Sequence, residues 1–182
     1  MTQVSNPIVR KYIGIDFSGA ARPWRPKCGK PTVWIATVTD GDGCILEDLR
    51  PVQELAGVGN PFERLVALLQ LGDFEAAAID APFSLPCRHM PKGNYSEFLA
   101  SIRALPNGPD RPFPMGGSIL ALGESGDQKT SEKPYRATEK HWINLGVNTR
   151  STMWNGVRPG SPFAAACLSL LSRASRPVWP WH

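Results

Sequence analysis

Hydrophobic positions near the start of the chain predict two β-strands. Residues 11–16 predict the first, and residues 32–38, with β-branched and aromatic side chains in near alternation, predict the second. The Asp-Gly turn at residues 40–43 then predicts a hairpin. A third strand over residues 44–49, antiparallel to the second, follows from that hairpin.

A helix is predicted next, because its start and stop signals surround an apolar face. Asn60 suits the N-cap, Pro61 the first helical position and Glu63 the reciprocal capping position, while Gly72 ends the helix. The apolar face consists of Phe62, Leu65, Val66 and Leu69.

A fourth strand is predicted over residues 74–80. Its run of small apolar residues predicts burial on both faces, as in a central parallel strand. The preceding helix provides a crossover, so we expect this strand to lie beside residues 11–16 and to run parallel to them.

Asp16 and Asp80 end these two strands and are therefore expected to be neighbours. Adjacent strands lie about 4.8 Å apart, and two carboxylates at that spacing repel unless a cation lies between them. Oxygen atoms from both side chains can bind one divalent ion. The sequence therefore predicts a metal site, and the alternative is that each aspartate only hydrogen-bonds its own turn.

The rest of the chain is rich in proline and glycine, with helices predicted over residues 94–105, 137–146 and 161–174. Residues 106–117 are expected to be irregular, 123–136 to form a polar loop and 177–181 to be extended. We expect one domain over residues 1–182, with a long irregular insertion near residues 84–160.

Composition and the chain start indicate a cytoplasmic protein without a membrane segment. Of the 182 residues, 42% are hydrophobic and 20% charged, which is typical of soluble globular proteins. No apolar run approaches the about 20 residues needed to span a bilayer, and the first residues lack the apolar centre of a secretory signal.

A net charge of +4 favours an anionic partner. The basic segment, residues 21–30, concentrates that charge in Arg22, Arg25, Lys27 and Lys30 and contains no acid. Its cations can neutralise phosphates, and the ring of Trp24 can stack on a base. The alternative is a solvated, proline-stiffened loop.

The cysteines and histidines form no recognisable metal-binding pattern. The four cysteines (Cys28, Cys44, Cys87 and Cys167) lie far apart, so we expect reduced thiols. His141 can assist proton transfer or lie at the surface. The later tryptophans suit packing or base stacking; they are Trp142, Trp154, Trp179 and Trp181.

Three motifs in order, "GIDFSGA", "AIDAPFSLP" and "YRATEKHW", carry a family resemblance. The chain resembles the domain-of-unknown-function family 429, predicted nucleases with an RNase H-like fold. The resemblance implies an α/β fold with a mixed sheet, three antiparallel strands, a helix and then a parallel strand, flanked by helices. It also implies an acidic site for Mg²⁺ or Mn²⁺ that hydrolyses phosphodiesters with two metal ions.

Carried over by motif, the resemblance implies that Asp16, Asp80 and Glu139 bind metal and that Arg136 is the basic partner of Glu139. An ordinary helix-surface ion pair is the alternative for the last two residues. Ser18 and Gly19 can present backbone N–H groups to a phosphate or can serve the turn alone.

One departure from the family concerns the last residues. An RNase H-like domain continues past its fifth strand into a helix, whereas this sequence stops about where that strand would begin. Either the chain is a C-terminally truncated relative, whose missing edge a second copy in a homodimer can supply, or its third acid comes from elsewhere, with Glu139 as the candidate.

Three functions follow from these patterns. The first is a metal-dependent nuclease acting on DNA or RNA, and the second is a catalytically inactive module of the same fold that binds nucleic acid or nucleotide. The third is an ATP-dependent phosphotransferase of the actin and sugar-kinase kind. For the third, "IGIDFSG" would be the first phosphate loop and "MGGSI" the second.

Overall fold

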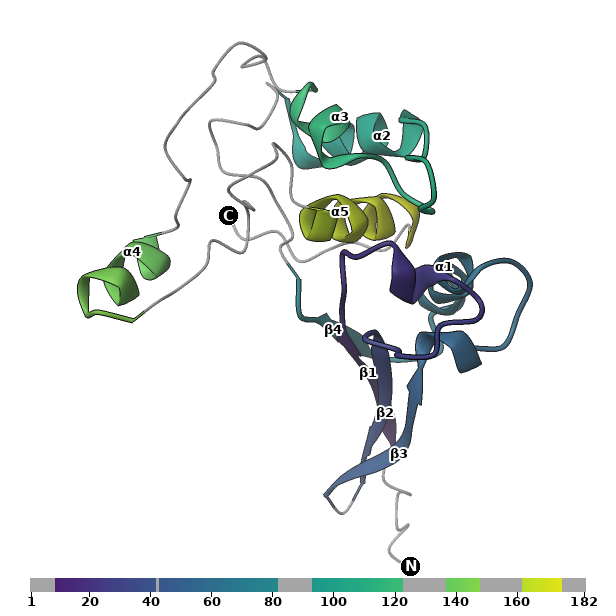
Figure 1. The fold of residues 1–182 in the computed structure, drawn as a ribbon. Coiled ribbons are helices and arrows are strands. Elements are labelled where there is room, and N and C mark those ends of the chain that lie inside the picture. The colour runs from purple at the N-terminus through teal and green to yellow at the C-terminus, as the bar shows by residue number, and fades with distance from the viewer. Residues whose placement is uncertain (1–8, 42, 82–92, 123–136, 148–161, 175–182) are drawn as a thin grey trace, which may run out of the picture. The chain divides into compact units, whose positions relative to one another are not determined.

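The structure, a computed structural model, describes residues 9–41, 43–81, 93–122, 137–147 and 162–174 (Figure 1). The chain divides into two compact units, which we describe separately. The first comprises Met1–Phe17 and Pro23–Asp80, and the second comprises Ser18–Arg22 and Ala81–His182.

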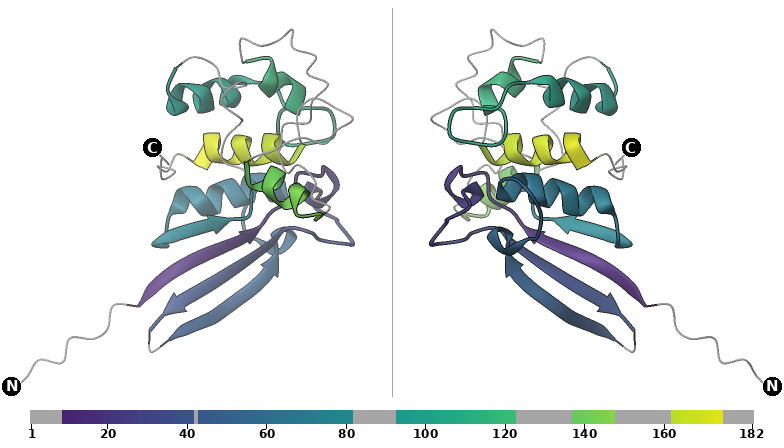
Figure 2. Two further views of the ribbon diagram at one scale, coloured as in Figure 1. Left: turned by 90° about the vertical axis from the view of Figure 1, so that its left-hand side faces the viewer. Right: turned by 90° about the vertical axis from the view of Figure 1, so that its right-hand side faces the viewer.

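The first unit contains a mixed four-stranded sheet in the order β3-β2-β1-β4 (Figure 2). Its strands are β1 (Arg10–Asp16), β2 (Trp34–Asp40), β3 (Cys44–Pro51) and β4 (Ala76–Ile79). The first three strands pair antiparallel, and β4 pairs parallel with β1. The predicted α/β class, the hairpin and the parallel crossover are thereby confirmed.

The predicted burial of the fourth strand is wrong. In the described sheet β4 lies at an edge, and Ala76, Ala77 and Ala78 are exposed. Alanine is small enough to fit a crowded central strand and also tolerates an exposed edge, so an alanine run does not determine which position a strand takes.

The two faces of the sheet differ in burial. Ile13, Ile15 and Ile35 share one face and are buried. We call the opposite one the open face, since none of its residues is buried. Its members by strand register are Tyr12, Gly14, Asp16, Trp34, Ala36, Val38, Leu46, Leu49, Ala76 and Ala78.

Helix α1 (Pro61–Leu71) has the predicted ends. The Asn60 side chain accepts hydrogen bonds from the backbone N–H groups of Phe62 and Glu63, and the Glu63 carboxylate accepts one from the Asn60 N–H. Gly72 ends the helix in the left-handed conformation, with φ of 70°. Figure 2 shows the helix against one side of the sheet.

An aromatic cluster joins the β1–β2 connection to α1 within the first unit. Trp24 lies in the short helix η1 (Arg22–Trp24), is 2% exposed and meets Phe62 edge-on at 5.1 Å between ring centroids. Phe17 lies 5.2 Å from the same indole. The suggestion that Trp24 stacks on a base is therefore wrong, because its ring belongs to the core.

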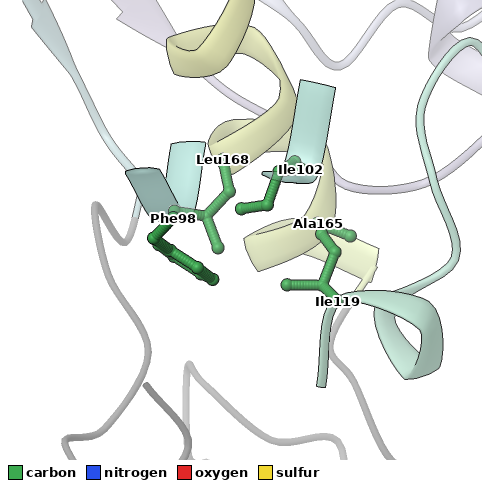
Figure 3. Close-up of a cluster of buried hydrophobic side chains, with 5 residues drawn as sticks. All are labelled: Phe98, Ile102, Ile119, Ala165 and Leu168. Carbon is green, nitrogen blue, oxygen red and sulfur yellow. The ribbon is translucent and has the colours of Figure 1, made fainter. Parts of the chain in front are cut away.

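The second unit is helical in its described part. It contains α2 (Tyr95–Ala104), α3 (Gly116–Leu120), α4 (Ala137–Asn144) and α5 (Pro162–Ala174). A buried cluster connects α2, α3 and α5, as Figure 3 shows; it consists of Phe98, Ile102, Ile119, Ala165 and Leu168. None of the described helices has both the length and the apolar character for crossing a lipid bilayer.

The short helix α3 was not predicted, because its residues fall at the end of a stretch rich in proline and glycine. Before it, the chain folds on itself, and the Gly108 N–H donates to the Phe113 carbonyl oxygen at 2.9 Å. The Phe113 side chain is fully buried, with the Arg111 guanidinium 5.9 Å from its ring centre. A buried aromatic thus orders a segment that composition alone marks as irregular.

We expect Asn60→Ala to lower the free energy of unfolding by about 1 kcal/mol, because two backbone N–H groups of α1 lose their acceptor. Urea denaturation measures this change. Asn60→Asp is the matched control, since it keeps an acceptor oxygen and should stay close to wild type. Equal loss in both variants would contradict the capping role.

Cys167 on α5 is a buried thiol, and burial raises its pKa to about 12. The unfolded thiol ionises near pH 8.5, so this contribution to stability is complete below about pH 8.5 and is lost as the pH rises towards 12. Cys167→Ala should therefore flatten the fall in stability between about pH 9 and 12, measured by urea denaturation at each pH. The exposed Cys44→Ala should leave that slope unchanged. A slope unaltered in Cys167→Ala would contradict the assignment.

Candidate functional site

The parallel pairing of β1 with β4 brings Asp16 and Asp80 to adjacent positions. Ile15 pairs with Ile79, and the Asp80 N–H donates to the Ile15 carbonyl oxygen at 3.0 Å. Each aspartate is therefore the next residue of its strand at the same level of the sheet, where neighbouring strands are about 4.8 Å apart. The predicted parallel pairing of the two strands that lead into these aspartates is confirmed, and we call Asp16 and Asp80 the acid pair.

Strand alternation sets the direction of the acid pair. Ile15 and Phe17 are buried, so Asp16 between them faces away from the core, and it is exposed. Asp80 follows the half-buried Ile79 and is also exposed. By alternation Asp16 belongs to the open face, and Asp80 is the next residue in the series of Ala76 and Ala78, which lie on that face.

Neither carboxylate of the acid pair makes a hydrogen bond or ion pair with another described residue, and the same holds for Glu54 and Glu75. Most acids of the first unit do have such a partner. Asp40 accepts from the Tyr12 hydroxyl at 3.0 Å, and Asp73 pairs with Lys11. Asp48 binds Arg50, and that hydrogen bond raises the pKa of the Arg50 guanidinium.

The turn after β1 does not depend on the Asp16 side chain. The Ala20 N–H donates to the Ser18 hydroxyl oxygen at 3.4 Å, so the serine caps its own turn. The local hydrogen bond offered as the alternative explanation for Asp16 is not found in the described part of the chain. Two unpaired carboxylates at the ends of neighbouring strands repel each other and are suited to a shared cation.

The described residues supply only two of the three predicted metal ligands. Glu139 lies in α4 of the second unit, and only its backbone is described; Arg136 lies outside the described residues. Among described residues no three histidine, cysteine, aspartate or glutamate side chains gather as a metal site. The acid pair can hold a divalent ion through two carboxylates, with water or phosphate oxygens completing the coordination.

The basic segment lies in the connection that leaves β1 at Asp16 and enters β2 at Trp34 (Figure 1). The last residue of β1, Asp16, pairs with the first residue of β2, Trp34. The connection that carries Arg25, Lys27 and Lys30 is therefore attached at the same end of the sheet as the acid pair. All three are exposed, and none forms an ion pair with a described residue. They are available to neutralise phosphate groups.

The remaining predicted groups belong to the second unit. Ser18, Gly19 and Arg22 fall in its short N-terminal part, with Arg22 exposed. His141 is exposed on α4 and has the Trp142 ring 5.8 Å away, so a surface position is confirmed for it. The "MGGSI" motif opens helix α3.

Sequence reasoning missed Trp34, which pairs with Asp16 in the antiparallel register of β1 and β2. Pro51, Trp34 and Asp16 therefore form one row across β3, β2 and β1, and Asp80 directly follows the end of the neighbouring β4. The sequence does indicate that β1 and β2 are strands, and the alternation along β2 indicates which residues share a face with Trp34. The pairing of Trp34 with Asp16 could not be predicted, because the long connection between β1 and β2 leaves the register of these strands undefined.

These features define an α/β protein with a mixed four-stranded sheet and two neighbouring aspartates at one end of it. Comparisons with models of protein families, with curated proteins and with solved structures found no match. The resemblance to the domain-of-unknown-function family 429 and its RNase H-like fold stays a prediction.

We expect Asp16→Asn and Asp80→Asn each to raise the melting temperature by about 1 to 4 °C in EDTA. Two unit charges about 4 Å apart interact by about 1 kcal/mol in water, and either change removes the repulsion. Saturating Mn²⁺ should raise the melting temperature of wild type but not of the double variant.

The matched control for this experiment is Asp73→Asn, which removes the same charge from an acid paired with Lys11. It should leave the melting temperature unchanged or slightly lower, because an exposed ion pair contributes little. Lower melting temperatures in both acid-pair variants without metal would contradict the repulsive arrangement.

Proposed function

We propose that this protein is a metal-dependent nuclease that hydrolyses phosphodiester bonds at the acid pair. The observation that carries the proposal is the adjacency of Asp16 and Asp80 on the open face, with no other described side chain neutralising either charge. Carboxylate oxygens from neighbouring strands are the ligands that a hard divalent cation prefers.

In this proposal Asp16 and Asp80 hold Mg²⁺ or Mn²⁺, and Glu139 is the predicted third ligand. Such ions activate a water molecule and stabilise the leaving oxygen of a phosphodiester. In this proposal the two aspartates fix where the scissile phosphate binds, because they directly follow Ile15 and Ile79, which pair across neighbouring strands. The phosphate thereby lies in line with the row that also contains Trp34.

The exposed cations of the basic segment support a polyanionic substrate. Arg25, Lys27 and Lys30 follow the strand that ends in Asp16, so phosphates flanking the cleaved one have cationic partners at the same end of the sheet. Each phosphate neutralised in this way makes binding more dependent on salt concentration. The net charge of +4 acts in the same direction at longer range.

We expect Asp16→Asn and Asp80→Asn each to lower kcat by at least about 100-fold, since loss of one charged stabilising group typically costs about 10² to 10³ in rate. The assay measures fragments released from labelled DNA and RNA, single-stranded and duplex, in Mg²⁺, Mn²⁺ or EDTA. Asp48→Asn is the control, because it removes an equal charge from the same sheet away from the acid pair.

Cleavage that persists in the double aspartate variant would contradict the proposal. Retention of nucleic acid by the wild-type protein without cleavage in either metal would also contradict it. That second result would instead identify an inactive binding module, and nucleotide-dependent thermal stabilisation without nucleic-acid binding would identify a phosphotransferase.

A further inference from the structure

Trp34 is a half-buried aromatic residue on a sheet face that has no buried member. Its indole makes no ring contact and no hydrogen bond with another described residue. Trp24, by contrast, packs between Phe17 and Phe62 in the core of the same unit. The core-packing role that explains Trp24 therefore does not explain Trp34.

The register places Trp34 directly beside the acid pair. Residues opposite each other in antiparallel strands have Cβ atoms about 4.5 to 5.5 Å apart, and Trp34 is opposite Asp16. Asp80 directly follows Ile79, the residue of β4 that pairs with Ile15, and its N–H donates to the Ile15 carbonyl oxygen. This end of the sheet thus presents an aromatic ring and two carboxylates.

The surroundings of Trp34 on the open face are apolar and accessible. Leu46 and Leu49 on β3 are 58% and 56% exposed. They pair with Val38 and Ala36 on β2, the strand that contains Trp34. A sheet surface that combines an aromatic ring with small and aliphatic side chains is suited to the flat face of a nucleobase.

We propose that Trp34 stacks on an unpaired base of single-stranded nucleic acid whose backbone phosphate lies at the acid pair. This inference rests on the proposed function and names its substrate class. A base within a duplex is covered on both faces by its neighbours, so it cannot stack on Trp34 without being unstacked first. The site therefore prefers single strands to duplexes.

The charges at this end of the sheet favour nucleic acid over an uncharged aromatic ligand. Arg25, Lys27 and Lys30 lie in the connection that leads into Trp34, and all are exposed. A groove or face that combines cations for the backbone with an aromatic ring for the bases is the usual arrangement for single strands.

The test measures binding separately from cleavage, by fluorescence anisotropy of a labelled single-stranded oligonucleotide in EDTA with the full chain. Trp34→Leu should weaken the Kd by about 5- to 150-fold, the usual effect of losing one stacked base. Trp34→Phe should retain most of the affinity. Leu71→Ala is the control, because Leu71 is an exposed apolar side chain at the end of α1.

Two further ligands make the measurement specific for stacking. An oligonucleotide of the same length without bases should bind wild type and Trp34→Leu equally, and so should a duplex. Circular dichroism and melting temperature show whether Trp34→Leu is folded. If Trp34→Leu does not fold, the affinity of Trp34→Phe decides the test, because that variant keeps an aromatic ring and should keep most of the binding.

Failure of this inference is distinguishable from failure of the nuclease proposal. Cleavage that needs the acid pair, together with unchanged single-strand binding in Trp34→Leu, would overturn the stacking role alone. Absence of cleavage, together with the expected loss in Trp34→Leu and full retention by Leu71→Ala, would leave the stacking role supported. Duplex binding as tight as single-strand binding would overturn the inference.

Discussion

The parallel pairing of β1 with β4 determines where both aspartates lie. Burial of Ile13 and Ile15 on one face fixes the phase of β1, so Asp16 must point to the other. The hydrogen bond from the Asp80 N–H to the Ile15 carbonyl oxygen then fixes the level of β4. A shift of one residue in that pairing would send one carboxylate to the buried face.

The sequence allowed the main features of this arrangement to be predicted where the signals were local or topological. The Asn60 cap, the hairpin and the crossover that makes β4 parallel were predicted correctly. Trp24 was misjudged because a tryptophan among cations looks accessible, whereas its tertiary neighbours place it in the core. The edge position of β4 and the register of Trp34 depend on long-range pairing that no local pattern specifies.

Some charged side chains of the first unit form ion pairs within the unit, and others have no such partner among the described residues. Asp48 and Asp73 are satisfied by neighbouring cations, whereas the acid pair has no cation of this unit bound to it. The cations of the basic segment also stay unpaired in the described structure, although they are attached to the same end of the sheet. Unpaired groups of both charges at one end of the sheet suit a metal ion, which the acids bind, and a phosphate substrate, which the cations bind.

The central claim is that the carboxylates of Asp16 and Asp80 lie side by side on one face of the sheet. A crystal structure of the protein with Mn²⁺, analysed by anomalous diffraction, tests this claim most directly. The account predicts an anomalous peak about 2.2 Å from an oxygen of each carboxylate. A structure in which the two side chains point to opposite faces, or in which saturating Mn²⁺ binds elsewhere only, would contradict it.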